Sequence, residues 1–197
     1  MFRGNKPVLI LPAILMVLML LGGYHFLQES ESVTNEDLQN IIEVQVSTNT
    51  TRQGLDIEAN WDWTVMPVEG LYGEDYIGIS VINRETGQVR TDIEIENGIL
   101  ELLYANQVIE QTEGTVVENG IIFAFSNQLI EHESYGNIGR VGASIIGEGL
   151  EKDDIIVTLL HTWSDHTPLE MEDARFSSPT FTGAANVPHW IVSQVAN

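Results

Sequence analysis

Two histidines and an aspartate lie within six residues of one another in the segment His161-Thr-Trp-Ser-Asp165-His166. Imidazole and carboxylate side chains at the end of a strand can converge on zinc or copper. His132 or His189 could supply a third nitrogen ligand. The residue types therefore indicate a candidate metal site at His161, Asp165 and His166, although their spacing is not specific to metal binding.

The same segment has two other interpretations. His161 shares its expected strand face with Leu159 and Trp163, which is typical of a hydrogen-bonded core histidine. Ser164-Asp165-His166 contains the residue types of a hydrolase, but catalytic triads are assembled in space and the chain has no GxSxG motif. A surface hydrolase is therefore a less favoured hypothesis than a binding protein.

Calcium is the other metal to consider, because three acidic loops offer oxygen ligands at residues 69–75, 151–154 and 170–173. None of them has the alternating carboxylates and central glycine of a dedicated calcium loop. We expect solvated turns at all three places. The chain contains no cysteine, which excludes disulfides and thiolate metal sites.

The sequence pattern predicts that the elements that position these residues are strands. Between Leu55 and Val65, apolar and polar residues alternate for eleven positions, a pattern that predicts a strand with one buried face and places Trp61 and Trp63 in the core. Short strands with turn signals every eight to twelve residues follow. We predict an all-β fold, an antiparallel β-sandwich of seven to nine strands with immunoglobulin-like proportions, over residues 34–197.

Two Asn-Gly dipeptides, Asn97-Gly98 and Asn119-Gly120, predict tight hairpins. A two-residue turn at the first dipeptide would place Glu94 directly across from Glu101. Like charges in such a pair cost stability unless salt screens them. We therefore expect Glu94→Gln or Glu101→Gln to be stabilising in low salt.

The segment Val8–Leu27 contains twenty residues without a charge, preceded by Arg3 and Lys6. This length and flanking charge predict a transmembrane anchor with its N-terminus in the cytoplasm. A cleaved signal peptide is the alternative. The expected organisation is a cytoplasmic stub and anchor at 1–27, a polar stalk at 28–33 and an extracytoplasmic domain at 34–197, in a single-pass cell-membrane protein.

All 29 acidic residues follow Leu27, against six basic ones, which gives this part a net charge of 6 − 29 = −23. Such a surface repels nucleic acid and favours a basic partner. We predict a membrane-anchored binding module without a cofactor, not an enzyme, whose partner is a protein or wall component. A metal-binding protein is the alternative.

Overall fold

The computed structural model describes residues 6–29, 32–130 and 133–196. The chain divides into two compact units between Ser32 and Val33. The first contains the helix α1 (Lys6–Glu29), with Pro12 inside it. Among the described residues, no helix combines the length and the apolar character needed to cross a membrane, so the structure does not support the anchor expected at Val8–Leu27.

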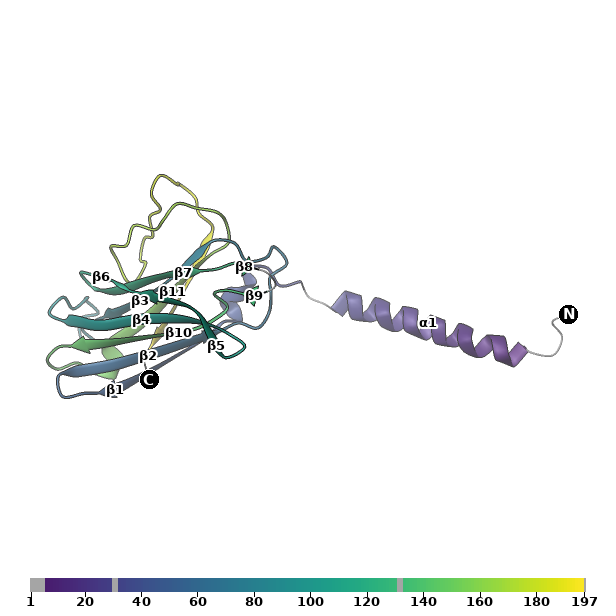
Figure 1. The fold of residues 1–197 in the computed structure, drawn as a ribbon, viewed down its shortest axis with the longest axis horizontal. Coiled ribbons are helices and arrows are strands. Elements are labelled where there is room, and N and C mark those ends of the chain that lie inside the picture. Colours follow the sequence, from purple (N-terminus) through teal and green to yellow (C-terminus); the bar gives the residue numbers. More distant parts are fainter. Residues whose placement is uncertain (1–5, 30–31, 131–132, 197) are drawn as a thin grey trace. The chain divides into compact units, whose positions relative to one another are not determined.

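The second unit contains two five-stranded antiparallel sheets that face each other (Figure 1). Sheet A has, in spatial order, β1 (Glu43–Thr50), β2 (Gly54–Asp62), β10 (Ile138–Ile146), β4 (Glu94–Tyr104) and β5 (Gln107–Glu113). Sheet B has β12 (His189–Val195), β11 (Ile155–Thr162), β3 (Glu74–Val81), β7 (Gly120–Ser126) and β6 (Thr115–Val117). The short elements are η1 (Asp37–Asn40), η2 (Lys152–Asp154), β8 (Leu129–Ile130) and β9 (Glu133–Ser134).

The core lies between the two sheets, because each strand of sheet A turns alternate side chains inward. In β2 the inward residues include Ile57 and Trp61, and the Trp61 ring packs 5.0 Å from that of Phe125 in sheet B. Trp63, just after β2, is also buried. The antiparallel sandwich is confirmed. The two sheets contain ten strands in the described part of the chain, whereas seven to nine were expected.

The hairpin predicted at Asn97-Gly98 is wrong, because both residues lie inside β4. On the neighbouring strand β10, Ser144 pairs with Glu96 and Gly142 with Ile99, so Asn97 and Gly98 together oppose one residue. This is a β-bulge. Asn97 has a φ of 53°, so the dipeptide provides the left-handed residue that the pattern implied, but it bends a strand and does not reverse it.

The bulge also changes the electrostatic prediction for Glu101. Glu101 pairs across the sheet with Arg140, whose Nε lies 2.6 Å from its carboxylate, while Glu94 lies opposite Ile146. We now expect Glu101→Gln to destabilise the domain by up to about 1 kcal/mol in low salt, as for other exposed ion pairs. Urea denaturation at low and high salt tests this. Stabilisation by Glu101→Gln in low salt would contradict the observed pairing.

The hairpin at the second Asn-Gly dipeptide forms, with a shifted turn. Val117 pairs with Gly120, so Glu118 and Asn119 are the two turn residues between β6 and β7. A further two-residue turn, at Ala105 and Asn106 between β4 and β5, has positive φ at both positions, 48° and 63°. This turn contains no glycine and therefore lacks the usual sequence pattern of a two-residue hairpin turn.

A long connection between β11 and β12, residues 163–188, packs on the outer face of sheet B (Figure 1). We call it the cover segment. A second, smaller core forms between the two, with Tyr76, Ile122 and Leu160 on the sheet and Leu169, Ala174, Phe176 and Phe181 on the cover segment. Sheet B is therefore covered on both faces, which explains why β3 and β11 are buried almost throughout.

Asp173 fixes the cover segment to the turn between β6 and β7. Its carboxylate accepts bonds from the backbone N–H groups of Arg175 (2.9 Å) and Ser177 (3.0 Å) and from the Asn119 side chain, while Asn119 accepts a bond from Ala174 N–H. Burial raises the pKa of Asp173, but the hydrogen bonds lower it by more, so that the pKa lies below the usual value of an aspartate.

A carboxylate with a depressed pKa stabilises the fold above its unfolded-state pKa, and this contribution is lost as the pH falls through the folded-state value. Asp173→Asn should therefore cost about 1.5 kcal/mol at pH 7. The deficit relative to the original chain should begin to shrink below a pH of about 4, where Asp173 becomes protonated in the unfolded state, and should continue to shrink as the pH falls through the lower pKa of the folded state. Urea denaturation across this pH range measures the deficit. A deficit that does not change with pH would contradict a stabilising role of the charged Asp173 carboxylate.

Candidate functional site

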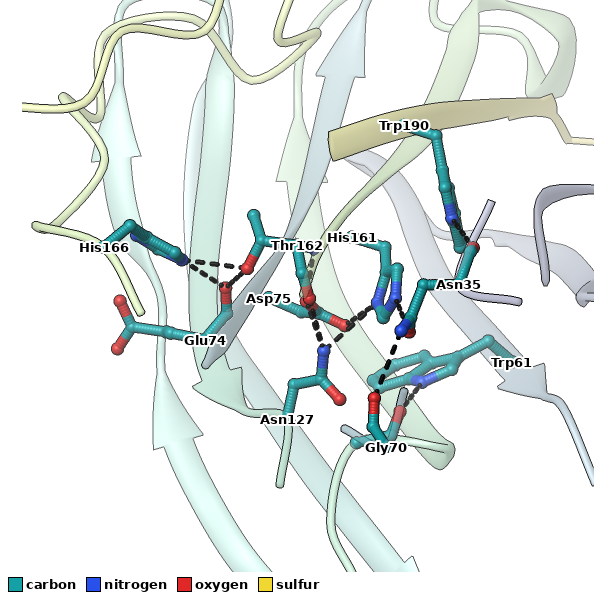
Figure 2. Close-up of polar contacts among 11 residues, drawn as sticks. Asn35, Trp61, Gly70, Glu74, Asp75, Asn127, His161, Thr162, His166 and Trp190 are labelled. Atoms are coloured by element: carbon teal, nitrogen blue, oxygen red, sulfur yellow. Dashed lines mark hydrogen bonds and ion pairs between the residues drawn. The ribbon is translucent and has the colours of Figure 1, made fainter. Parts of the chain in front are cut away.

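His161, the first of the expected metal ligands, is fully buried in β11 and points into the core (Figure 2). Its Nδ1 lies 2.8 Å from Asp75 Oδ2 on β3, and its Nε2 lies 3.1 Å from Asn35 Oδ1. Both ring nitrogens are therefore engaged in hydrogen bonds. Neither offers a free lone pair to a metal ion.

The orientation of the Asn35 side chain determines the direction of the second bond. Asn35 Nδ2 donates to Glu69 Oε2 (3.2 Å) and to the carbonyl oxygen of Gly70 (3.1 Å), so its Oδ1 is the atom that faces His161. An amide oxygen only accepts, and His161 Nε2 must therefore carry a proton. A second proton lies in the bond between Nδ1 and the Asp75 carboxyl group.

Asp75 has the partners that a buried carboxyl group requires. Its Oδ1 accepts bonds from the backbone N–H of Thr162 and from Asn127 Nδ2, both at 2.9 Å, and its side chain is 0% exposed. Asn127 Nδ2 also donates to the carbonyl oxygen of Thr162, at 2.8 Å. These bonds connect β3 directly to the end of β11.

Asn35 extends this network to the beginning of the domain. Its backbone N–H donates to Glu69 Oε2 at 2.9 Å, and its carbonyl oxygen accepts a bond of 2.7 Å from the indole of Trp190 on β12. We call Asn35, Asp75, Asn127 and His161 the Asn35 network. An aspartate, a histidine and a polar third group are also the parts of a catalytic triad, but here Nε2 meets an amide oxygen inside the core, so the arrangement is structural.

His166 lies on the other side of Thr162 from His161 (Figure 2). Its Nε2 lies 2.9 Å from Thr162 Oγ1 and 3.2 Å from the carbonyl oxygen of Glu74, and its Nδ1 lies 2.7 Å from the carbonyl oxygen of Thr167. His161 and Thr162 point to opposite faces of sheet B because successive residues of a strand alternate between the two faces. The chain then returns on the outer side, where His166 contacts Thr162.

The structure therefore does not bring His161 together with Asp165 and His166, the other two expected metal ligands. Asp165 and His166 line a hollow of about 400 Å³, and His161 is not one of its lining residues. His189 Nδ1 lies 2.8 Å from the carbonyl oxygen of Val187, and His132 lies outside the described residues. Within the described ranges, no group of three or more histidine, aspartate or glutamate side chains could hold a metal ion.

Carboxylates from all three acidic loops bind polar groups of the protein. Glu69 binds Asn35, Asp154 accepts a bond of 2.9 Å from the backbone N–H of Glu151, and Asp173 holds the cover segment. Sequence reasoning treated the three loops as solvated turns and missed these roles. The signal for two of them was weak, because Glu69 binds a residue 34 positions away and Asp173 binds one 54 positions away.

A different surface is the better candidate for binding. The outer face of sheet A has a hollow of about 420 Å³ around Gly142 on β10, lined by Asn49, Asp56, Ile57, Glu58, Ile99, Glu101, Gln111, Arg140, Val141 and Gly142. A Cβ atom added at Gly142 would meet only Ile57 O, at 3.7 Å, so the missing side chain leaves open space. The rim carries three carboxylates and one guanidinium group.

Two of these carboxylates are held in place by neighbouring strands. Ser144 on β10 donates a bond of 2.7 Å to Asp56 Oδ1 on β2, and Arg140 on β10 binds Glu101 on β4. Glu58 is exposed and lies opposite Gly142. With a net charge of −2, the hollow is suited to a ligand that brings positive charge and hydrogen-bond donors.

No family model matches this chain, and no significant match was found among curated proteins or solved structures.

Proposed function

We propose that this protein is an extracytoplasmic, membrane-attached binding module that binds a basic protein surface on the outer face of sheet A. One observation carries the binding role, namely the asymmetry between the sheets. The cover segment occupies the outer face of sheet B, whereas the hollow around Gly142 lies open on sheet A. An open, polar strand face with a hollow is typical of a docking surface.

Charge supports a basic partner. Beyond the hollow, the exposed outward residues of sheet A include Asp62 and Glu96, and Arg140 is engaged by Glu101. The same sign of charge dominates the chain as a whole, with 29 acidic residues against eight basic ones. Such a field accelerates encounter with a basic partner and disfavours an acidic one.

The binding role can be tested with the full chain in neutral detergent and a ten-residue lysine peptide as the probe, with affinity measured by fluorescence anisotropy. Gly142→Val places a side chain in the hollow, where an added Cβ atom meets only Ile57 O at 3.7 Å, and it should weaken binding about tenfold, or about 1.4 kcal/mol. Glu58→Gln should also weaken binding. The matched control is Glu118→Gln, which removes one exposed charge at the turn between β6 and β7.

Attraction to the overall negative charge alone would make Glu58→Gln and Glu118→Gln equivalent and leave Gly142→Val without effect. That result would refute the proposal that the outer face of sheet A is the binding surface. Equal affinity for a ten-residue glutamate peptide would refute the basic partner.

The membrane attachment rests on the sequence alone, on the uncharged Val8–Leu27 after Arg3 and Lys6. If the proposal is correct, protease added to intact protoplasts of an expressing bacterium removes the domain, and an alkaline carbonate wash leaves the undigested chain with the membranes. Survival of the domain in intact protoplasts, or its release by carbonate, would contradict the proposed location.

A further inference from the structure

One end of the sandwich carries a concentration of exposed apolar side chains. They come from the loop between β2 and β3 and from β8, and they are Val65 (39% exposed), Met66 (42%), Val68 (64%), Tyr72 (61%), Leu129 (54%) and Ile130 (41%). We call these six residues the apolar end. Patches of this kind on a soluble surface mark contact with a protein or a membrane.

Backbone hydrogen bonds hold the two segments of the apolar end side by side. Trp63 N–H donates to the carbonyl oxygen of Asn137 at 3.0 Å, and Asn127 N–H donates to that of Gly73 at 3.1 Å. Figure 1 shows β8 and β9 at this end, with β6 at the opposite end of the sandwich.

The domain also begins at the apolar end. Val68 N–H donates to the carbonyl oxygen of Val33, the first residue of the second unit, at 2.9 Å. Two residues later, the Asn35 network fixes the chain to β11 and β12. The entry point of the chain therefore cannot move away from this end without breaking buried hydrogen bonds.

Half of the apolar end comes from an uncharged stretch of the loop between β2 and β3. Residues 63–68 contain no charged side chain, and Glu69, the next residue, binds Asn35. The outer face of sheet A carries several carboxylates, which an anionic headgroup layer repels. At the edge of the apolar end, Glu133 pairs with Ile130, and the exposed Asp165 lines a hollow together with Tyr72. The uncharged stretch 63–68 is therefore the part of this end that can enter a lipid interface without desolvating a free carboxylate.

We propose that the apolar end inserts into the headgroup region of the membrane to which the chain is attached, with Tyr72 at the interface and the aliphatic side chains deeper. This inference rests on the proposed membrane attachment. Residues 30–32 separate Glu29 from Val33, and so short a connection spans about 14 Å at most, which keeps the entry point close to the lipid surface. When the domain contacts the membrane through the apolar end, the outer face of sheet A stays open to a partner.

The absence of native cysteine allows one labelled residue to report on its surroundings. Full chains with Val68→Cys or Val116→Cys, each carrying an environment-sensitive fluorophore, are reconstituted in phosphatidylcholine vesicles that contain a spin-labelled lipid quencher. Val116 is a matched control, since it is 59% exposed and lies on β6. We expect lipid quenching at position 68 to exceed that at position 116 by about twofold or more, because interfacial side chains penetrate about 5–10 Å.

The outcomes separate the two proposals. A chain that carbonate strips from the vesicles lacks membrane attachment, which overturns the proposed function and this inference with it. A chain that stays attached but shows equal, weak quenching at positions 68 and 116 overturns the inference alone. A blue-shifted label at position 68 without lipid quenching identifies a protein occupant, such as a second copy, and also overturns it.

Discussion

Asp75→Ala is expected to lower the free energy of unfolding by about 3–5 kcal/mol, because it leaves several buried partners without an acceptor. The Thr162 N–H, the Asn127 amide and His161 Nδ1 all bind this carboxyl group, which is closed to solvent. Removing it also leaves a cavity between β3 and β11.

Asp75→Asn provides the diagnostic comparison. An asparagine can still accept through its oxygen, and its Nδ2 can donate to His161 Nδ1 if the ring becomes neutral with its remaining proton on Nε2. The bond to Asn35 is then preserved, so we expect a smaller loss, about 1–2 kcal/mol. A loss as large as that of the alanine variant would show that the charge of the pair, and not its hydrogen-bond pattern, stabilises the core.

Urea denaturation followed by tryptophan fluorescence measures these losses in the full chain, because all four tryptophans lie after residue 60. Asp165→Ala is the matched control, since Asp165 is exposed and lines only a surface hollow. Its effect should stay within about 0.5 kcal/mol. An equal effect of Asp75→Ala and Asp165→Ala would remove the basis for a stabilising Asn35 network.

The sandwich was predictable because alternation over β2 depends only on which face is buried, and that pattern is local. The bulge at Asn97 was not, because the left-handed residue that closes a hairpin also serves a bulge. The choice between them depends on β10, more than 40 residues later in the chain. Sequence alone could therefore identify the special backbone at Asn97 but not its consequence for Glu94 and Glu101.

The candidate sites show the same limit. The sequence correctly raised a hydrogen-bonded core histidine as an interpretation of His161, since the strand face it shares is visible in the pattern. Its partners could not be inferred, because Asn35 lies 126 positions away and Asp75 lies 86 positions away. The hollow around Gly142 depends on residues from all five strands of sheet A and on a side chain that is absent, and neither leaves a local signal.

Gly78→Ala is expected to detach the cover segment and to lower the free energy of unfolding by about 3 kcal/mol. Gly78 lies in the middle of β3, and a Cβ atom there would come within 2.0 Å of Ala174 O in the cover segment. A contact with backbone cannot be relieved by a rotamer change, so the segment itself must move. Tyr76, Ile122 and Leu160 would then lose the apolar partners that cover them.

Because the second core is separate from the one between the sheets, the damage should be local. Limited proteolysis of Gly78→Ala should cleave within residues 163–188 much faster than in the original chain, while far-ultraviolet circular dichroism retains the strand signal. Gly142→Ala is the matched control, a strand glycine whose added Cβ meets nothing closer than 3.7 Å. Equal protease resistance of the two variants would mean that close packing at Gly78 does not hold the cover segment on sheet B.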